Sequence, residues 1–226
     1  APPAAPSAAT AARRAPPGTV DTYKSMTELV RNEKDWMIET QDRNSKSLIT
    51  AIHGGGIECG TSELALLVAE LSNVNYFTFK GLKPKNNRTL HVTSTNYDNP
   101  NLLYWNQFMN VTIAIHGYSS NQANSYIGGL DERLISLITH NLKVSGFNIE
   151  AAPERIAGKE INNITNKNAY GMGVQIEIST QQRKEFFSRN DFSQKNRENT
   201  HNWTEDMYYY ANAICAAIND RKWVEA

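Results

Sequence analysis

Short apolar runs alternate along the chain with stretches in which apolar residues recur at helical spacing. Runs rich in branched residues, or strict alternation of apolar and polar residues, predict five strands: Leu48–His53, Asn75–Leu82, Leu90–Thr95, Val111–His116 and Gly173–Ser179. Helical spacing predicts four helices: residues 24–46, Thr61–Ala69, Leu130–Leu142 and Thr204–Arg221. Strands that alternate with helices predict a single α/β domain, in which a mixed, mostly parallel sheet is covered by helices on both faces.

The two ends of the chain differ in character. The first 17 residues contain eight Ala and five Pro and no large apolar side chain, so we expect residues 1–18 to be a disordered tail. Residues 19–226 form the folded domain, and its predicted last helix packs on the core through an apolar stripe. A Pro/Ala-rich stalk favours a secreted protein; the alternative is the terminal tail of a cytoplasmic or phage-encoded protein.

Charge and hydropathy exclude two classes of partner. The chain contains 23 Lys and Arg against 23 Asp and Glu, whereas a generic nucleic-acid binder usually carries a basic excess. No apolar run approaches the roughly 18 residues of a membrane-spanning helix. We therefore expect neither nucleic acid nor membrane as a partner, and we expect a monomer. Two cysteines, Cys59 and Cys215, allow at most one disulfide.

Two histidines stand where predicted apolar strands end. His53 and His116 each follow a buried run and precede a glycine, and ligands of open α/β sheets bind beyond the carboxyl ends of the strands. Glu58 comes five residues after His53, across a Gly-rich loop that can fold the carboxylate back toward the imidazole. Two histidines and one glutamate are the ligand set of a catalytic zinc site with an open position for water.

Glu177 completes this set of residues. It lies on the polar side of the predicted strand Gly173–Ser179, where an unpaired buried carboxylate is costly unless it has a function. Glu177 is therefore the candidate general base. Two alternatives stay open at this point: the histidines are structural, or Cys59 is a nucleophile that works with a histidine.

Six ordered motifs carry a resemblance to a known family. They are HGGGIECGTSELA from His53, LHVTSTNYDNP from Leu90, AIHG from Ala114, YIGGLD from Tyr126, NNITNK from Asn162, and GVQIEIS from Gly173 with Arg183. Over residues 21–190 the chain resembles the poly-γ-glutamate hydrolases of bacteria and their phages, zinc enzymes with a fold similar to zinc carboxypeptidases. The resemblance implies Zn²⁺ ligands His53, Glu58 and His116, a zinc-bound water as nucleophile, and Glu177 as general base.

The resemblance also implies residues that contact the substrate, an anionic polymer with γ-glutamyl amide bonds. His91 matches a position lining the cleft, where it or a nearby cation stabilises the oxyanion. The other implied contacts are Asn163, Asn166, Lys167 and Arg183. Lys167 replaces a common arginine, and Cys59 replaces a common proline; these departures affect substrate preference more than catalysis.

Two other functions remain open at the level of sequence. One is a zinc amidase or carboxypeptidase that acts on γ-D-glutamyl bonds of peptidoglycan. The other is a polyglutamate-binding module without catalytic activity.

Overall fold

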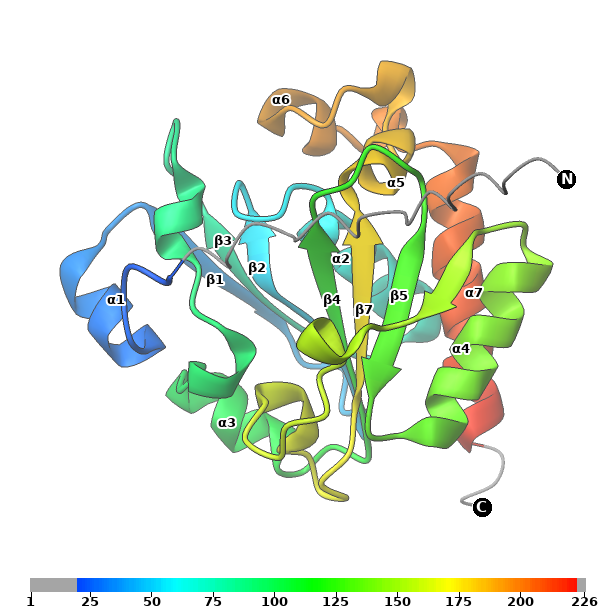
Figure 1. Ribbon diagram of the computed structural model, residues 1–226, viewed down its shortest axis with the longest axis horizontal. Coiled ribbons are helices and arrows are strands. Elements are labelled where there is room, and N and C mark those ends of the chain that lie inside the picture. The colour runs from blue at the N-terminus through cyan, green and yellow to red at the C-terminus, as the bar shows by residue number, and fades with distance from the viewer. Residues whose placement is uncertain (1–19, 223–226) are drawn as a thin grey trace, which may run out of the picture.

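A seven-stranded sheet organises the chain in the computed structural model, which describes residues 20–222 (Figure 1). The strand order is β1-β3-β2-β4-β7-β5-β6. Strands β2, β3, β4 and β7 are parallel, β1 and β5 run antiparallel to β3 and β7, and β6 is parallel to β5. This arrangement confirms the mixed, mostly parallel sheet. The strands span Trp36–Gln41 (β1), Ser47–Gly55 (β2), Asn75–Gly81 (β3), Val111–Tyr118 (β4), Ser125–Gly129 (β5), Ile149–Ala151 (β6) and Val174–Ser179 (β7).

Helices cover both faces of the sheet, as predicted. One face carries α2 (Thr61–Ser72), α4 (Glu132–Val144) and α7 (Glu205–Lys222), and α7 packs against both of the others (Figure 1). The other face carries α1 (Met26–Asn32) and α3 (Pro100–Asn106). Two short helices, α5 (Thr180–Glu185) and α6 (Gln194–Arg197), lie near the carboxyl end of β7.

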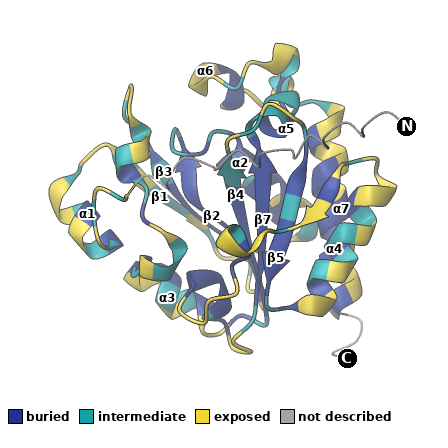
Figure 2. Cartoon of the chain, viewed as in Figure 1, coloured by how far each residue is buried: buried dark blue, intermediate teal, exposed yellow. Residues whose placement is uncertain are grey.

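Alternation along the strands divides the core between these two faces. The central strands of the sheet are mostly buried (Figure 2). Ile113, Ile115 and Ile176 belong to the cluster beneath α2, α4 and α7. Leu48 and Phe79 belong to the second cluster, beneath α1 and α3. On this second face, β4 and β7 present polar side chains instead: Thr112, His116, Gln175 and Glu177. The half of the face over β4 and β7 is therefore free to hold a polar site.

Two predicted elements are wrong. The helix over residues 24–46 ends at Asn32, and Trp36–Gln41 forms β1, which pairs with β3 and stacks Trp36 on Phe79 at 5.5 Å. Residues 90–95 form no strand but two 3₁₀ turns joined by extended chain. The backbone there serves other groups: the Val92 carbonyl faces His53 at 2.8 Å, and the Thr93 N–H donates to Asp21 at 2.6 Å.

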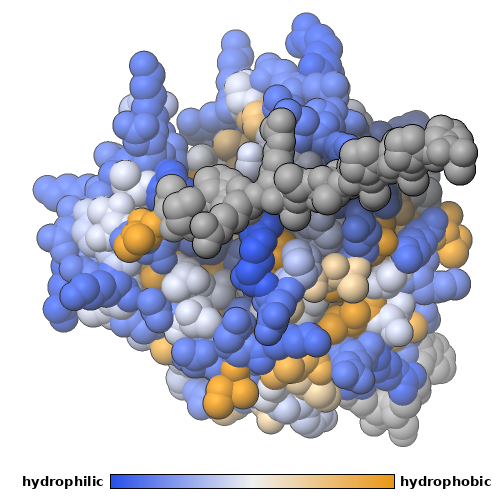
Figure 3. Space-filling view, in the orientation of Figure 1, coloured by the Kyte–Doolittle hydropathy of each residue, from blue (hydrophilic) through white to orange (hydrophobic). Residues whose placement is uncertain are grey.

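Three expectations concern features outside the sheet. The predicted tail, residues 1–18, lies outside the described residues. Within residues 20–222, none of the helices combines the length and apolar character that crossing a bilayer requires. Hydrophilic side chains cover most of the face shown in Figure 3. Cys59 and Cys215 are both free thiols.

Candidate active site and metal centre

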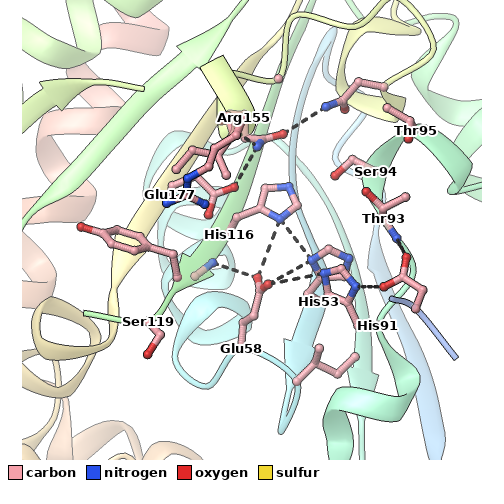
Figure 4. Close-up of a pocket in the computed structure, with 18 of the residues that line it drawn as sticks. His53, Glu58, His91, Thr93, Ser94, Thr95, His116, Ser119, Arg155 and Glu177 are labelled. Atoms are coloured by element: carbon pink, nitrogen blue, oxygen red, sulfur yellow. Dashed lines mark hydrogen bonds and ion pairs between the residues drawn. The ribbon is translucent and has the colours of Figure 1, made fainter. Parts of the chain in front are cut away.

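The carboxyl ends of β2, β4 and β7 meet at a cavity of about 900 Å³ (Figure 4). His53 reaches it from β2, His116 from β4 and Glu177 from β7. The parallel register places His116 directly beside Glu177, so the sheet itself sets their spacing. All three side chains are buried, with 2–8% of their surface exposed, and they project from rigid strands rather than from loops.

Glycines at the end of β2 allow the chain to turn and bring Glu58 back to the strand end. Gly55 has a φ of +64°, and a Cβ on Gly54 would lie 2.5 Å from the Thr78 hydroxyl oxygen, so neither position accepts a side chain without strain. The Glu58 backbone N–H then donates to the His53 carbonyl at 2.9 Å. The carboxylate turns into the cavity, where the Gly117 N–H donates to its Oε2 at 2.8 Å.

Three side chains direct ligand atoms at one point. His53 Nδ1 lies 3.2 Å from His116 Nδ1 and 3.3 Å from Glu58 Oε1, and His116 Nδ1 lies 3.7 Å from Glu58 Oε2. Ligand atoms at tetrahedral vertices about 2.0–2.1 Å from a zinc-sized ion lie roughly 3.4 Å apart. His53 Nε2 donates to the Val92 carbonyl at 2.8 Å, which leaves the lone pair on Nδ1. These donors therefore fit a divalent transition metal.

The two carboxyl groups of the site have opposite electrostatics. Burial acts to raise the pKa of Glu58, but the charges and hydrogen bonds of His53 and His116 outweigh it and hold that pKa well below its usual range. Burial raises the pKa of Glu177 to about 7, against the opposing charge of His116 and with the Glu58 charge adding to the rise. Glu58 is thus ionised, as a metal ligand would be, whereas burial makes Glu177 the more basic of the two carboxyl groups.

A chain of amides holds Glu177 in place. Gln175 Nε2 donates to Glu177 Oε1 at 2.8 Å, and Asn163 Nδ2 donates to Gln175 Oε1 at 3.1 Å. Sequence reasoning missed Gln175, although the signal was present: it shares the polar face of β7 with Glu177. Asn163 lines the cavity as expected of a substrate-contacting residue, but its amide group is directed to Gln175.

His91 lies against His53 and Glu58. Its ring stacks on His53 with centroids 3.9 Å apart, and its Nε2 lies 3.9 Å from Glu58 Oε1. His53, Glu58 and His91 form a second set whose ligand atoms all lie within 4.8 Å of one another. Asp21, which sequence reasoning missed, accepts a hydrogen bond from His91 Nδ1 at 2.6 Å. No motif includes Asp21, because the two residues meet across 70 positions of sequence.

The remaining predicted contacts fall into two groups. Arg183 lines the cavity and is buried; its guanidinium donates to the carbonyls of Cys59 at 2.7 Å and Ile178 at 3.0 Å. Asn166 and Lys167 are not among the described residues that line this cavity. Asn166 ties loops together, since it donates to the Gly158 and Glu160 carbonyls and accepts from the Gly173 N–H.

The exposed side chains of Arg88 and Arg155 line the cavity from two different loops. Cys59 is not among its described lining residues, so the geometry does not support a Cys–His nucleophile.

Known proteins similar to this chain are consistent with this geometry. Residues 22–213 match the family model described as poly-gamma-glutamate hydrolase. The SPbeta prophage-derived UPF0714 protein YoqZ of Bacillus subtilis (strain 168) is 41% identical, over 88% of this chain and 72% of its own length. The UPF0714 protein YmaC of the same organism is 38% identical, over 88% of this chain and 84% of its own.

Two solved structures superpose closely on this one. A bacteriophage poly-gamma-glutamate hydrolase has a TM-score of 0.87 and 36% identity, and the match covers 91% of this chain and 100% of that one. The zinc-free apo form of YndL has a TM-score of 0.82 and 34% identity, with 89% and 99% covered.

Proposed function

The chain belongs to the poly-γ-glutamate hydrolase family, and we propose that it cleaves the γ-glutamyl amide bonds of poly-γ-glutamate with a zinc ion and Glu177 as general base. One observation carries the proposal. His53 Nδ1, His116 Nδ1 and the Glu58 carboxylate converge within 3.2–3.7 Å of one another beside a buried carboxyl group with a raised pKa.

Zinc is the metal that this donor set favours. His53, Glu58 and His116 would hold it, because two imidazoles and one carboxylate form the protein ligands of known hydrolytic zinc sites. The zinc-free apo form of the similar protein YndL supports this choice. When bound, zinc supplies a Lewis acid that acidifies a water and polarises the amide carbonyl.

Glu177 moves the proton during hydrolysis. In its ionised form it accepts a proton from the attacking water, and it then delivers that proton to the nitrogen of the leaving amine. Burial raises the pKa of Glu177, so its carboxylate accepts a proton more readily than an exposed glutamate would. Gln175 keeps Oε1 occupied at 2.8 Å, so the carboxyl group presents its other oxygen for the transfer.

Cations around the cavity account for an anionic polymer as substrate. Each residue of poly-γ-glutamate carries a free α-carboxylate next to the amide that is cleaved. Arg88 and Arg155 lie on the rim, and a guanidinium group can bind such a carboxylate in a bidentate manner. Arg183 places a further positive charge deep in the cavity. A few local cations therefore suffice, although the whole chain has no net charge.

Digestion of two substrates tests this proposal. Purified protein loaded with zinc is incubated with poly-γ-glutamate and, separately, with muropeptides that contain γ-D-glutamyl bonds. We expect the polymer to shorten and new amino ends to appear, EDTA to stop the reaction, and added zinc to restore it. Cleavage of muropeptides alone would establish the peptidoglycan alternative. A protein that binds the polymer but releases no amino ends would be the binding module.

A further inference from the structure

We propose that His91 is a fourth protein ligand of the metal, and that Asp21 is the positioning residue that turns its lone pair toward the site. The proposal rests on the proposed function, since it takes a metal at His53, Glu58 and His116 as its starting point. It concerns the loop between β3 and α3, which the ligand set expected from the sequence does not include.

The His91 ring lies beside two of the proposed metal ligands, His53 and Glu58. His91 follows the 3₁₀ turn Asn87–Leu90, and its ring stacks on His53 at a centroid distance of 3.9 Å and an interplanar angle of 29°. Its Nε2 faces Glu58 Oε1 at 3.9 Å. Its ligand atom lies within 4.8 Å of those of His53 and Glu58, so one ion can be reached by all three.

Asp21 determines which ring nitrogen of His91 carries the proton. Asp21 Oδ1 lies 2.6 Å from His91 Nδ1, while Asp21 Oδ2 accepts the Thr93 backbone N–H at 2.6 Å. An ionised carboxylate only accepts hydrogen bonds, so the ring proton is on Nδ1 and the lone pair of neutral His91 is on Nε2, which faces the site. Histidines that bind metals characteristically donate their second ring nitrogen to a carboxylate or a carbonyl.

The same arrangement recurs on the neighbouring ring. His53 donates its Nε2 proton to the carbonyl of Val92, the residue that follows His91. One short segment, residues 91–93, thus supplies a ring, the carbonyl that fixes the tautomer of His53, and the N–H that holds Asp21. A neutral His91 with its lone pair on Nε2 cannot donate a hydrogen bond to an oxyanion. The geometry therefore favours a metal ligand over the oxyanion role that the sequence suggested. A catalytic zinc site can expand to five ligands, so four protein ligands would still leave a position for a water.

Metal binding, rather than turnover, tests this proposal. Apparent zinc affinity is measured by competition with a chromophoric chelator, and the visible spectrum of the Co²⁺-substituted protein reports the number and type of ligands. We expect His91→Ala to weaken zinc binding by more than about tenfold and to change the Co²⁺ spectrum. We expect Asp21→Asn to weaken zinc binding by about tenfold.

Two matched controls separate this effect from a loosened fold. Asp98→Asn removes a different carboxylate that anchors the same N-terminal segment, since Asp98 accepts the Thr27 N–H at 2.9 Å. His140→Ala removes an exposed histidine of α4. Both controls should bind zinc within twofold of the unaltered protein. If His91→Ala fails to fold, as judged by circular dichroism, His91→Gln replaces it.

The outcomes are distinct. Unchanged zinc affinity and an unchanged Co²⁺ spectrum in His91→Ala, with turnover reduced, would overturn the proposal and assign His91 to the substrate. His53→Ala should lose stoichiometric zinc in either case. If the unaltered protein and His53→Ala bind zinc equally, the metal centre of the proposed function fails as well.

Discussion

Replacing Glu177 with glutamine should change how the stability of the metal-free protein depends on pH. Glu177 is buried with 8% of its surface exposed, and its pKa is raised from 4.5 to about 7. A raised pKa in the folded state means that folding is most favourable while the group is protonated in both states. This contribution is complete below pH 4.5 and is lost as the pH rises through 7.

The magnitude follows from the same values. A change of one pKa unit corresponds to 1.36 kcal/mol. With a pKa of 4.5 in the unfolded chain and about 7 in the folded protein, the linkage relation gives a loss of roughly 2–3 kcal/mol between pH 5 and pH 8. Glutamine has no ionised form, so Glu177→Gln lacks this loss. It retains a side-chain oxygen that can accept the Gln175 hydrogen bond.

Urea unfolding in EDTA at pH 5 and pH 8 measures the difference. Relative to the unaltered protein, Glu177→Gln should gain roughly 2–3 kcal/mol in unfolding free energy on going from pH 5 to pH 8. Glu132→Gln, at an exposed position on α4, serves as the control and should show no such gain. An equal pH dependence of Glu177→Gln and the unaltered protein would refute the reasoning that burial disfavours the ionised form of Glu177.

Three further substitutions test the surroundings of the site. Gln175→Leu removes the 2.8 Å hydrogen bond to Glu177, so kcat should fall about tenfold or more while zinc content and KM change little. Steady-state kinetics and metal analysis measure these quantities, and an unaltered kcat would contradict the positioning role of Gln175. Gly117→Ala places a Cβ 2.5 Å from Arg183 Cζ and should lower the unfolding free energy, measured by urea titration, by about 1–3 kcal/mol. A stability equal to that of the unaltered protein would show that the guanidinium group moves aside freely. Arg155→Ala removes a positively charged side chain from the cavity rim and should raise KM for the polymer at low salt. This difference in KM should shrink as added salt screens the charge, and a KM effect independent of salt would contradict an electrostatic role.

The convergence of His53, His116 and Glu177 could be predicted from sequence because the ends of apolar strands can be recognised in it. His53 and His116 each end an apolar run and precede glycine, and parallel strands bring such ends to one edge of the sheet. Glu177 breaks the pattern of a buried strand. These signals are local, and the parallel pairing of β4 with β7 turns them into one site.

Other parts of the fold depend on contacts that local sequence does not encode. Strand β1 contains residues that favour helices, Met37, Glu39 and Gln41, yet it is extended because β3 offers a free edge. Residues 90–95 alternate like a strand but have no strand partner, and their backbone serves His53 and Asp21 instead. Asn166 lies in a motif that implied contact with substrate, yet its side-chain amide hydrogen-bonds to the backbone of the surrounding loops instead. Asp21 is far from His91 in sequence, so its contribution depends on tertiary structure.

The central claim joins a zinc centre to a general base, and one measurement tests both on the same sample. Glu177→Gln is purified, its zinc content is determined, and it is incubated with poly-γ-glutamate while the chain length and free amino ends of the polymer are followed. The account predicts one zinc per chain, as in the unaltered protein, with loss of polymer cleavage. A zinc-loaded Glu177→Gln that shortens the polymer at the unaltered rate would contradict it.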